Sequence, residues 1–310
     1  MSDTVVQESE ATIAKGSQSF AAAAKLFDRR TRDDAVMLYT WCRYCDDVID
    51  GQELGYGKGG VPAQDEQLER LRELQSKTDQ ALSGIRSADV HFEALRRVVE
   101  RNDINPRYPL QLLQGFEMDV RRATYQTLND TKLYCYHVAG VVGVMMAMIM
   151  GAREPSTLDR ASDLGIAFQL TNICRDIIDD AREGRCYVPS QMLADAGIKN
   201  VDPDDPQQRA LLHPVAVSLL QTADRYYNSA YAGIAELPFR SAWAIASARR
   251  VYRAIGRKLV TLGPRAWDER VSTSRWTKAG LVLLALGDVI LTRVYRPRYA
   301  RGDLFNRPTA

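Results

Sequence analysis

The chain has few of the residues that many metal and disulfide sites require. Its only histidines are His91, His137 and His213, and none follows a glutamate at the spacing of a di-iron carboxylate bundle. Five cysteines, an odd number, argue against a disulfide framework and are typical of a reducing cytoplasm. Cys42 and Cys45 form a C-x-x-C pair, but no second pair completes a zinc site. The sequence therefore argues against iron, zinc and disulfide chemistry.

The chain also lacks a strong excess of charge and a long hydrophobic run. Its formal net charge is +2, so we expect no nucleic-acid partner. The most apolar windows, 138–150 and 279–291, are shorter than the ~20 residues of a membrane-spanning helix, and the second contains Asp288. We expect both windows to be buried core helices and the protein not to cross a membrane.

Strand-like alternation of any length is missing as well. Alanine- and leucine-rich runs with helical periodicity recur along the chain, interrupted by glycine and proline. The sequence predicts an all-α fold, with one helical domain over residues 13–295 around a central apolar cavity. We expect residues 1–12 to be a disordered polar tail. Residues 296–310 are expected to form a basic tail that is solvated or contacts anionic lipid.

Two acidic motifs stand out against this background, "WCRYCDDVIDG" at 41–51 and "NICRDIIDD" at 172–180. Asp46 and Asp50 are four residues apart, as are Asp176 and Asp180, so each pair lies on one helix face with Cβ atoms ~5–6 Å apart. Like charges at this spacing destabilise a helix. They are also unfavourable in a last turn, where the helix dipole is negative. Their presence calls for a cation.

The residues around these acids indicate which cation. Tyr39 and Arg43 continue the first stripe, and Gln169 and Asn172 continue the second, while the flanking positions are apolar. The polar stripes are therefore expected to face an interior cavity, although a solvated acidic face is the plainer alternative. Oxygen ligands without histidine or cysteine favour Mg²⁺ or Mn²⁺. With donors from arginine nearby, the pattern is typical of a diphosphate clamp.

Such a clamp can draw charge from a diphosphate leaving group, so that an allylic C–O bond ionises. The carbocation must then be kept from water by an apolar, aromatic wall. The segment 131–150, "TKLYCYHVAGVVGVMMAMIM", is a candidate for that wall, because its tyrosine rings can stabilise a cation and its methionines adapt in shape. Ordinary helix packing is the alternative interpretation.

The motifs "GSQSF", "YCDDVID", "YCYHVAGVVG" and "QLTNICRDIIDDAREGRCYVP" together resemble the squalene/phytoene synthase family, over residues 16–295. The similarity is greatest to the bacterial phytoene synthases. It implies a single-domain isoprenoid-synthase helical bundle and a head-to-head condensation of two geranylgeranyl diphosphates through prephytoene diphosphate to 15-cis-phytoene, with release of two diphosphates. It implies no need for NADPH, a cytoplasmic and peripherally membrane-associated protein, and handover of the product to a phytoene desaturase.

The resemblance also implies roles for individual residues. Metal ligands, several Mg²⁺ or Mn²⁺ ions in all, would be Asp46, Asp50, Asn172, Asp176 and Asp180. The same aspartates, with Arg43 and Tyr134, would be catalytic. Substrate would be bound by Ser17, Tyr39, Arg43, Tyr134, Gln169, Asn172, Arg175, Tyr187, Tyr252 and Arg275. Some relatives carry a basic residue or histidine beside Ser17, where this chain has Gly16 and Gln18.

Other functions remain open on the sequence alone. A dehydrosqualene synthase of the same family would use farnesyl diphosphate, and chain length depends on the depth of the cavity. "DDVID" also fits the D-D-x-x-D of chain-elongating prenyltransferases, but the second motif reads D-x-x-D-D instead of repeating it. The spacing of Asn172, Asp176 and Asp180 fits a terpene-cyclase metal motif. A non-catalytic lipid-binding or assembly factor would have no reason to keep both acidic pairs.

Overall fold

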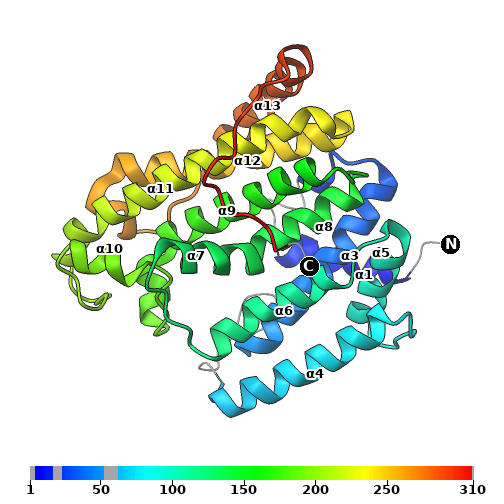
Figure 1. The fold of residues 1–310 in the computed structure, drawn as a ribbon, viewed down its shortest axis with the longest axis horizontal. Coiled ribbons are helices and arrows are strands. Elements are labelled where there is room, and N and C mark those ends of the chain that lie inside the picture. Colours follow the sequence, from blue (N-terminus) through cyan, green and yellow to red (C-terminus); the bar gives the residue numbers. More distant parts are fainter. Residues whose placement is uncertain (1–3, 17–22, 52–61, 309–310) are drawn as a thin grey trace.

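The computed structural model describes residues 4–16, 23–51 and 62–308, and these ranges contain helices and no strands (Figure 1). This confirms the all-α prediction. The main helices are α1 (Thr4–Gly16), α3 (Arg29–Asp50), α4 (Gln64–Leu82), α5 (Val90–Asn102), α6 (Arg107–Val120), α7 (Leu128–Cys135), α8 (Val141–Ile149), α9 (Pro155–Arg182), α10 (Ser190–Asp195), α11 (Gln208–Gly233), α12 (Phe239–Leu262) and α13 (Arg275–Tyr295). Short 3₁₀ turns lie at Ile234–Glu236 and Gly263–Trp267.

The two helices that carry the acidic motifs are bounded by clear local signals. α3 begins after Asp28, whose side chain accepts a hydrogen bond from the Thr31 backbone, and ends at Gly51 with a left-handed backbone (φ 66°). α9 begins with Pro155 at its first turn and is followed by Gly184 at φ 71°. The acids of both motifs therefore lie in or near last turns.

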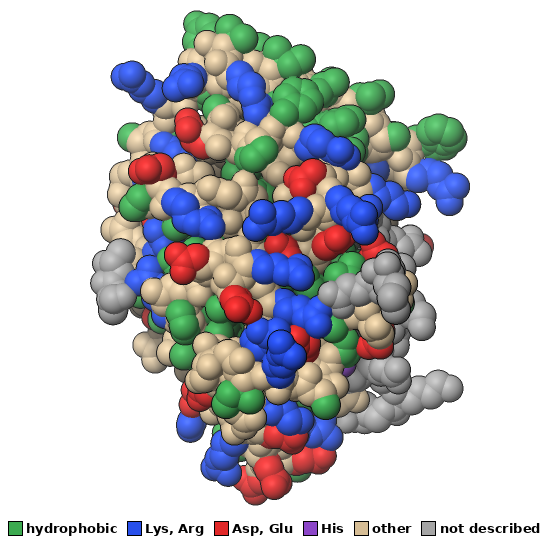
Figure 2. Space-filling model, turned by 90° about the vertical axis from the view of Figure 1, so that its right-hand side faces the viewer, with side chains coloured by type: hydrophobic (Ala, Val, Ile, Leu, Met, Phe, Trp, Pro, Cys, Tyr) green, Lys and Arg blue, Asp and Glu red, His purple; other side chains and the backbone are tan. Residues whose placement is uncertain are grey.

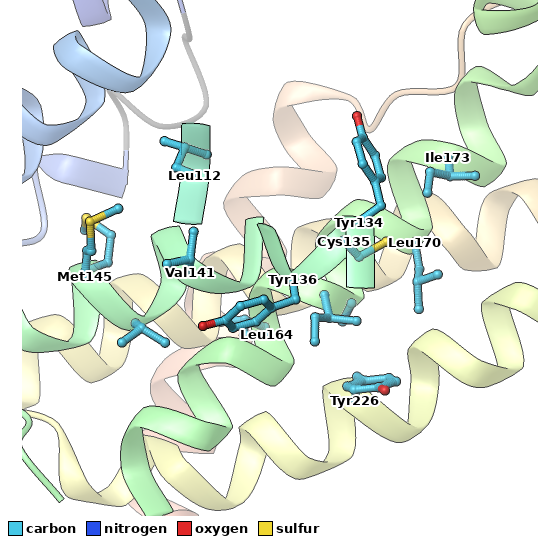
Figure 3. Packing of buried hydrophobic residues seen from close by; sticks show 14 of the residues in the cluster. Leu112, Tyr134, Cys135, Tyr136, Val141, Met145, Leu164, Leu170, Ile173 and Tyr226 are labelled. Atoms are coloured by element: carbon cyan, nitrogen blue, oxygen red, sulfur yellow. The ribbon is translucent and has the colours of Figure 1, made fainter. Parts of the chain in front are cut away.

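α7 and α8 are joined by a π-helical segment, η1 (Tyr136–Gly140), into one continuous helix of 22 residues, Leu128–Ile149. Its length and composition would suffice to cross a membrane, but 67% of its most apolar window is buried inside the protein. It packs against α6 and α9 as a core helix, with Tyr136 and Met145 fully buried (Figure 3). The prediction of a buried core helix over 138–150 is confirmed. The same prediction for 279–291 is wrong, because this window lies in α13, where only one face is buried and Leu283 and Leu291 are exposed.

Close approach of backbones fixes this helix against α9. A Cβ atom at Gly165 would overlap the carbonyl oxygen of Ala139 and would lie only 2.6 Å from the carbonyl carbon of the same residue. Gly143 meets the carbonyl group of Ala161 in the same way. Glycine at both positions therefore brings the core helix and α9 into direct backbone contact.

The prediction of a disordered tail over residues 1–12 is wrong for residues 4–12, which belong to α1. Its composition is polar, but Val5, Ser9 and Ile13 recur every four residues, and Ser9 and Ile13 are buried where α1 packs against α3 and α5. A narrow stripe of small and apolar residues is enough to dock a short helix on a larger surface.

The C-terminal segment after α13 runs back across the molecule toward α6 (Figure 1). Arg301 makes two hydrogen bonds to the buried Asp163 of α9, at 2.9 and 3.0 Å, and Arg307 donates to Asp159 at 2.6 Å. The backbone of Phe305 donates to the Tyr226 hydroxyl. A solvated end is therefore the wrong interpretation for this part of the basic tail, because its arginines neutralise acids on α9.

Replacement of Arg301 by alanine is expected to lower the free energy of unfolding by about 3 kcal/mol, because it leaves Asp163 buried without its cation. The melting temperature should fall by roughly 5 °C at pH 7. Burial already raises the pKa of Asp163, and loss of Arg301 raises it further. The folded variant then takes up a proton at a pH where the unfolded chain does not, so the loss should shrink as the pH is lowered toward 5.

Arg225→Ala serves as the control, because its pair with Asp303 in the same segment is exposed on both sides. It should change the free energy of unfolding by less than about 1 kcal/mol. Equal melting temperatures for the two variants would contradict a structural role for the Arg301–Asp163 pair.

Candidate active site

The first acidic row lies on the last two turns of α3. Arg43 reaches Asp46 at 2.9 Å and Asp47 at 2.7 Å from the same face. Burial among the surrounding helices raises the pKa of Asp46 to about 6, and the negative charges of Asp50 and Asp47 add to the rise. Arg43 opposes it. Because 41% of the side chain is exposed, solvent screens these charges in part. One arginine therefore does not compensate the negative charge of this row.

The second acidic row follows one face of α9. Its polar members are half-buried, while Ile173 and Ile177 beside them are buried, as the apolar flanks predicted. Asp176 accepts hydrogen bonds from Arg175 at 2.5 and 2.8 Å and from Arg270 at 3.2 Å. Burial alone would raise the pKa of Asp176, but the two arginines outweigh it and lower the pKa.

Asp180 lies one turn further along α9, where the charge of Arg185 only partly compensates its own. Burial, the adjacent Asp176 and Glu183 raise the pKa of Asp180 to about 8. A carboxylate in this condition is strongly stabilised by any added cation. Asp179, its neighbour in sequence, is exposed and pairs with Arg182 on the surface.

Arg185 connects the two rows. It forms an ion pair with Asp50 of α3, and its charge also lowers the pKa of Asp46, of Asp180 on α9 and of Asp119 on α6. Arg185 follows Asp180 by five residues, so its ion pair with Asp50 brings the end of α3 near the end of α9. This ion pair supports the expectation that both acidic stripes face one interior space.

Asn172 presents an unsatisfied acceptor within the second row. Its side-chain oxygen is buried without a hydrogen-bond partner, while its amide nitrogen donates to Gln169 at 3.3 Å. A buried carbonyl oxygen without a donor is costly, so this oxygen is available to coordinate a cation or to accept a hydrogen bond from a ligand. Among the described residues no three His, Cys, Asp or Glu side chains form a ready metal cluster, and arginines hold most of the acids.

A group of tyrosines lies beside the acidic rows. Asp119 accepts hydrogen bonds from the hydroxyls of Tyr134 at 3.0 Å and Tyr187 at 2.9 Å, and the two rings stack with centroids 4.6 Å apart. Burial raises the pKa of both phenols, so they stay protonated and act as donors. Burial also raises the pKa of Asp119 to about 6, against the effect of these hydrogen bonds.

A cavity of about 330 Å³ opens beside the second row. Arg175, Arg270 and Tyr252 line it together with apolar residues of α12 and with Lys278 of α13. The Tyr252 ring stacks on Phe168 at 4.2 Å. The space therefore has cationic groups beside Asp176 and an aromatic, apolar wall.

A family model described as Squalene/phytoene synthase matches residues 13–277 of this chain. The chain belongs to the squalene/phytoene synthase family. A family member from Enterobacter agglomerans, a 15-cis-phytoene synthase, is 51% identical over 94% of this chain and 99% of its own length. The 15-cis-phytoene synthase of Paracoccus sp. (strain N81106 / MBIC 01143) is 49% identical over 99% of both chains.

Solved structures of family members share the fold. A dehydrosqualene synthase in complex with a ligand matches with a TM-score of 0.78 and 25% identity over 91% of this chain and 95% of that one. The squalene synthase HpnC from Alicyclobacillus acidocaldarius matches with a TM-score of 0.66 over 86% of this chain and 97% of its own. The prediction of an isoprenoid-synthase helical bundle is therefore confirmed.

The structure brings many of the predicted family site residues together, but not all. Ser17 lies outside the described residues. Arg275 is exposed at the first position of α13, and Arg270, five residues earlier, makes the contact with Asp176. The described cavity is lined by α9, α12 and residues 270–278, not by 131–150, so the predicted apolar wall over 131–150 stays a prediction.

Three residues that the sequence did not single out belong to this region: Asp119, Arg185 and Arg270. Arg185 stands inside the quoted motif "REGRCYVP", so its place close after Asp180 was a usable signal. Asp119 and Arg270 have acidic and aromatic neighbours in sequence, but neither segment has the four-residue acidic spacing of the two motifs. Only the folded arrangement brings them beside the rows.

Proposed function

We propose that this protein is a phytoene synthase of carotenoid biosynthesis that joins two geranylgeranyl diphosphates head to head, through prephytoene diphosphate, to 15-cis-phytoene. Two relatives named 15-cis-phytoene synthase, about half identical over nearly the whole chain, support the reaction. The site supports it through a concentration of carboxylates and arginines at one end of an apolar, aromatic space. Ionisation of an allylic diphosphate requires charged groups that stabilise the leaving diphosphate and an apolar space that keeps the carbocation from water.

The donor set fits Mg²⁺ or Mn²⁺. The proposed ligands are carboxylate and amide oxygens only: Asp46, Asp50, Asn172, Asp176 and Asp180. The observation that carries this assignment is the unsatisfied Asn172 oxygen in the same row as Asp180, whose pKa is raised to about 8. When bound, the metal ions supply positive charge that stabilises the departing diphosphate.

The arginines of the site have a defined part in this scheme. Arg175 and Arg270 neutralise Asp176, and Arg185 neutralises Asp50, in the structure. With Asp50 and Asp176 as metal ligands, the guanidinium groups would be free to donate to the diphosphate oxygens, which arginine binds well in pairs. The arginines thus hold the acidic rows together before substrate binds.

The tyrosines act on the hydrocarbon part of the reaction. Tyr134 and Tyr187 are fixed by their hydrogen bonds to Asp119 and by their mutual stacking, so their rings are held in place. Their buried faces exclude water and stabilise positive charge through the π-electrons. Asp119 is therefore a positioning residue for both rings.

A dehydrosqualene synthase is the second candidate, because a protein of that name shares the fold at a TM-score of 0.78. It would run the same chemistry on farnesyl diphosphate. The two candidates differ in the length of chain that the apolar space accepts.

The test is product identity. Purified protein is incubated with Mg²⁺ and either the C20 or the C15 diphosphate, without NADPH, and the hydrocarbon is identified by chromatography and mass spectrometry. We expect phytoene from the C20 substrate, and none after removal of the metal with EDTA. Exclusive formation of a C30 product would assign the second candidate, and a cyclised product would contradict both.

A further inference from the structure

The outward face of α13 is apolar along its whole length. Between the two ends of the helix, the exposed positions carry only apolar and small residues and one threonine: Trp276, Thr277, Ala279, Gly280, Leu283, Leu284, Gly287, Ile290, Leu291, Val294 and Tyr295. Leu283 is 69% exposed and Val294 is 77% exposed. A surface helix ordinarily turns charged residues to water, so this face is suited to contact with something apolar.

The opposite face shows that this orientation of α13 is enforced. Asp288 is buried and accepts two hydrogen bonds of 2.6 Å from Arg250 of α12, and Trp243 of α12 donates to the Val282 backbone at 2.8 Å. Ala285 and Val289 are buried on the same side. The buried ion pair fixes the rotation of α13 about its own axis, so the opposite face of the helix points to the outside.

Charges around the helix point to an anionic partner. Arg275 precedes the apolar face, Arg296 and Arg298 follow it, and all three are exposed. The buried Asp288 is the only acidic residue between positions 275 and 302. Figure 2 shows hydrophobic side chains gathered at the top of the molecule, where α13 lies, with Lys and Arg side chains on both flanks. The exposed Trp276 and Tyr295 stand at the two ends of the face, where rings favour the boundary of a bilayer.

The size of the face favours a bilayer over a second copy of the chain. A helix of 21 residues is about 30 Å long, and one side of it offers on the order of 400 Å². A stable protein dimer buries about 800 Å² on each partner. A planar lipid surface needs no such minimum from one helix, because cationic residues add attraction to anionic headgroups.

We propose that α13 docks this protein on the surface of an anionic lipid bilayer, with the helix lying in the plane of the membrane. Lys278, in the first turn of α13, lines the cavity that reaches Arg175 and Tyr252. Docking would therefore bring the part of the cavity that Lys278 lines close to the bilayer. If the proposed function holds, prenyl chains and the hydrocarbon product pass between membrane and site at this end without crossing water.

The full-length protein can be tested by sedimentation with vesicles of phosphatidylcholine, alone or with about 30% phosphatidylglycerol. We expect binding to the mixed vesicles, and at least a tenfold loss of binding for Leu283→Asp and, separately, for Leu291→Asp. Arg296→Glu combined with Arg298→Glu should weaken binding to the mixed vesicles severalfold. Neither set of residues belongs to the active site, so turnover in detergent should stay within about twofold of the parent.

Ile85→Asp and Arg86→Glu are matched controls, because both positions are exposed on the loop between α4 and α5, away from α13. They should leave vesicle binding unchanged. Vesicle binding that survives both leucine variants overturns the proposal, as does conversion of a dimer to a monomer by Leu283→Asp without any binding to vesicles. Because sedimentation does not depend on turnover, failure of docking and failure of the proposed reaction are separate results.

Discussion

Replacement of Asp180 by asparagine is expected to lower turnover at least a thousandfold while the melting temperature stays the same or rises. The side chain keeps its shape but loses the charge that a divalent cation would require. In the folded protein that charge is destabilising, because burial and neighbouring acids raise the pKa of Asp180 to about 8. Removal of the charge relieves the folded state above pH 4 or so, where the unfolded chain would ionise.

Turnover with saturating Mg²⁺ and thermal melting with and without Mn²⁺ are the measurements. Manganese should raise the melting temperature of the parent and have little effect on the variant. Asp179→Asn is the matched control, one residue earlier on α9, where the exposed carboxylate pairs with Arg182 on the surface. It should keep turnover within about twofold. Asp180→Asn with more than a tenth of parental turnover would remove Asp180 from the metal site.

Gly165→Ala is expected to destabilise the protein by at least about 3 kcal/mol and to lower the melting temperature by roughly 5 °C or more. The added Cβ would overlap the carbonyl of Ala139 and lie 2.8 Å from the Cα atom of Gly140. These are backbone atoms, so no side chain can rotate away, and α9 must move off the core helix. Because α9 carries the second acidic row, turnover should fall as well.

Gly280→Ala is the comparison for this substitution, because a Cβ there meets nothing within 4 Å on the exposed face of α13. Alanine in a helix interior is favoured over glycine, so this variant should gain about 0.5–1 kcal/mol. Denaturant titration of both variants gives the difference directly. A Gly165→Ala protein as stable as the parent would mean that the two helices are further apart than the structure places them.

The helical fold and the two acidic stripes could be predicted because both depend only on the spacing of residues that are close in sequence. Asp46 and Asp50, or Asp176 and Asp180, share a face at four-residue intervals whatever the rest of the chain does. The apolar neighbours of those acids also predicted that the stripes would be partly buried. Such patterns depend on the periodicity of one helix, which the sequence contains in full.

Contacts between distant segments could not be read in this way. Arg185 pairs with Asp50 across 135 positions, and Arg301 pairs with Asp163 across 138. Each arginine belongs to a segment that looks like an ordinary charged turn or tail. Their partners are set by how the helices pack, so the spacing of residues along the chain predicts neither the role of Arg185 nor the contact of the C-terminal segment with α9.

The π-helical segment Tyr136–Gly140 has a consequence for the whole core helix. Each residue of an α-helix advances the side chains by about 100°, and the wider turn inserts one residue out of step. Upstream, Tyr134 is aimed at Asp119, and downstream, Gly143 is aimed at α9. Without the shift in phase, these two surfaces would not both face their partners. The number of residues between Tyr134 and Gly143 thus matters as much as their identity. Deletion of one residue between them would break either the contact of the tyrosine with Asp119 or that of the glycine with α9.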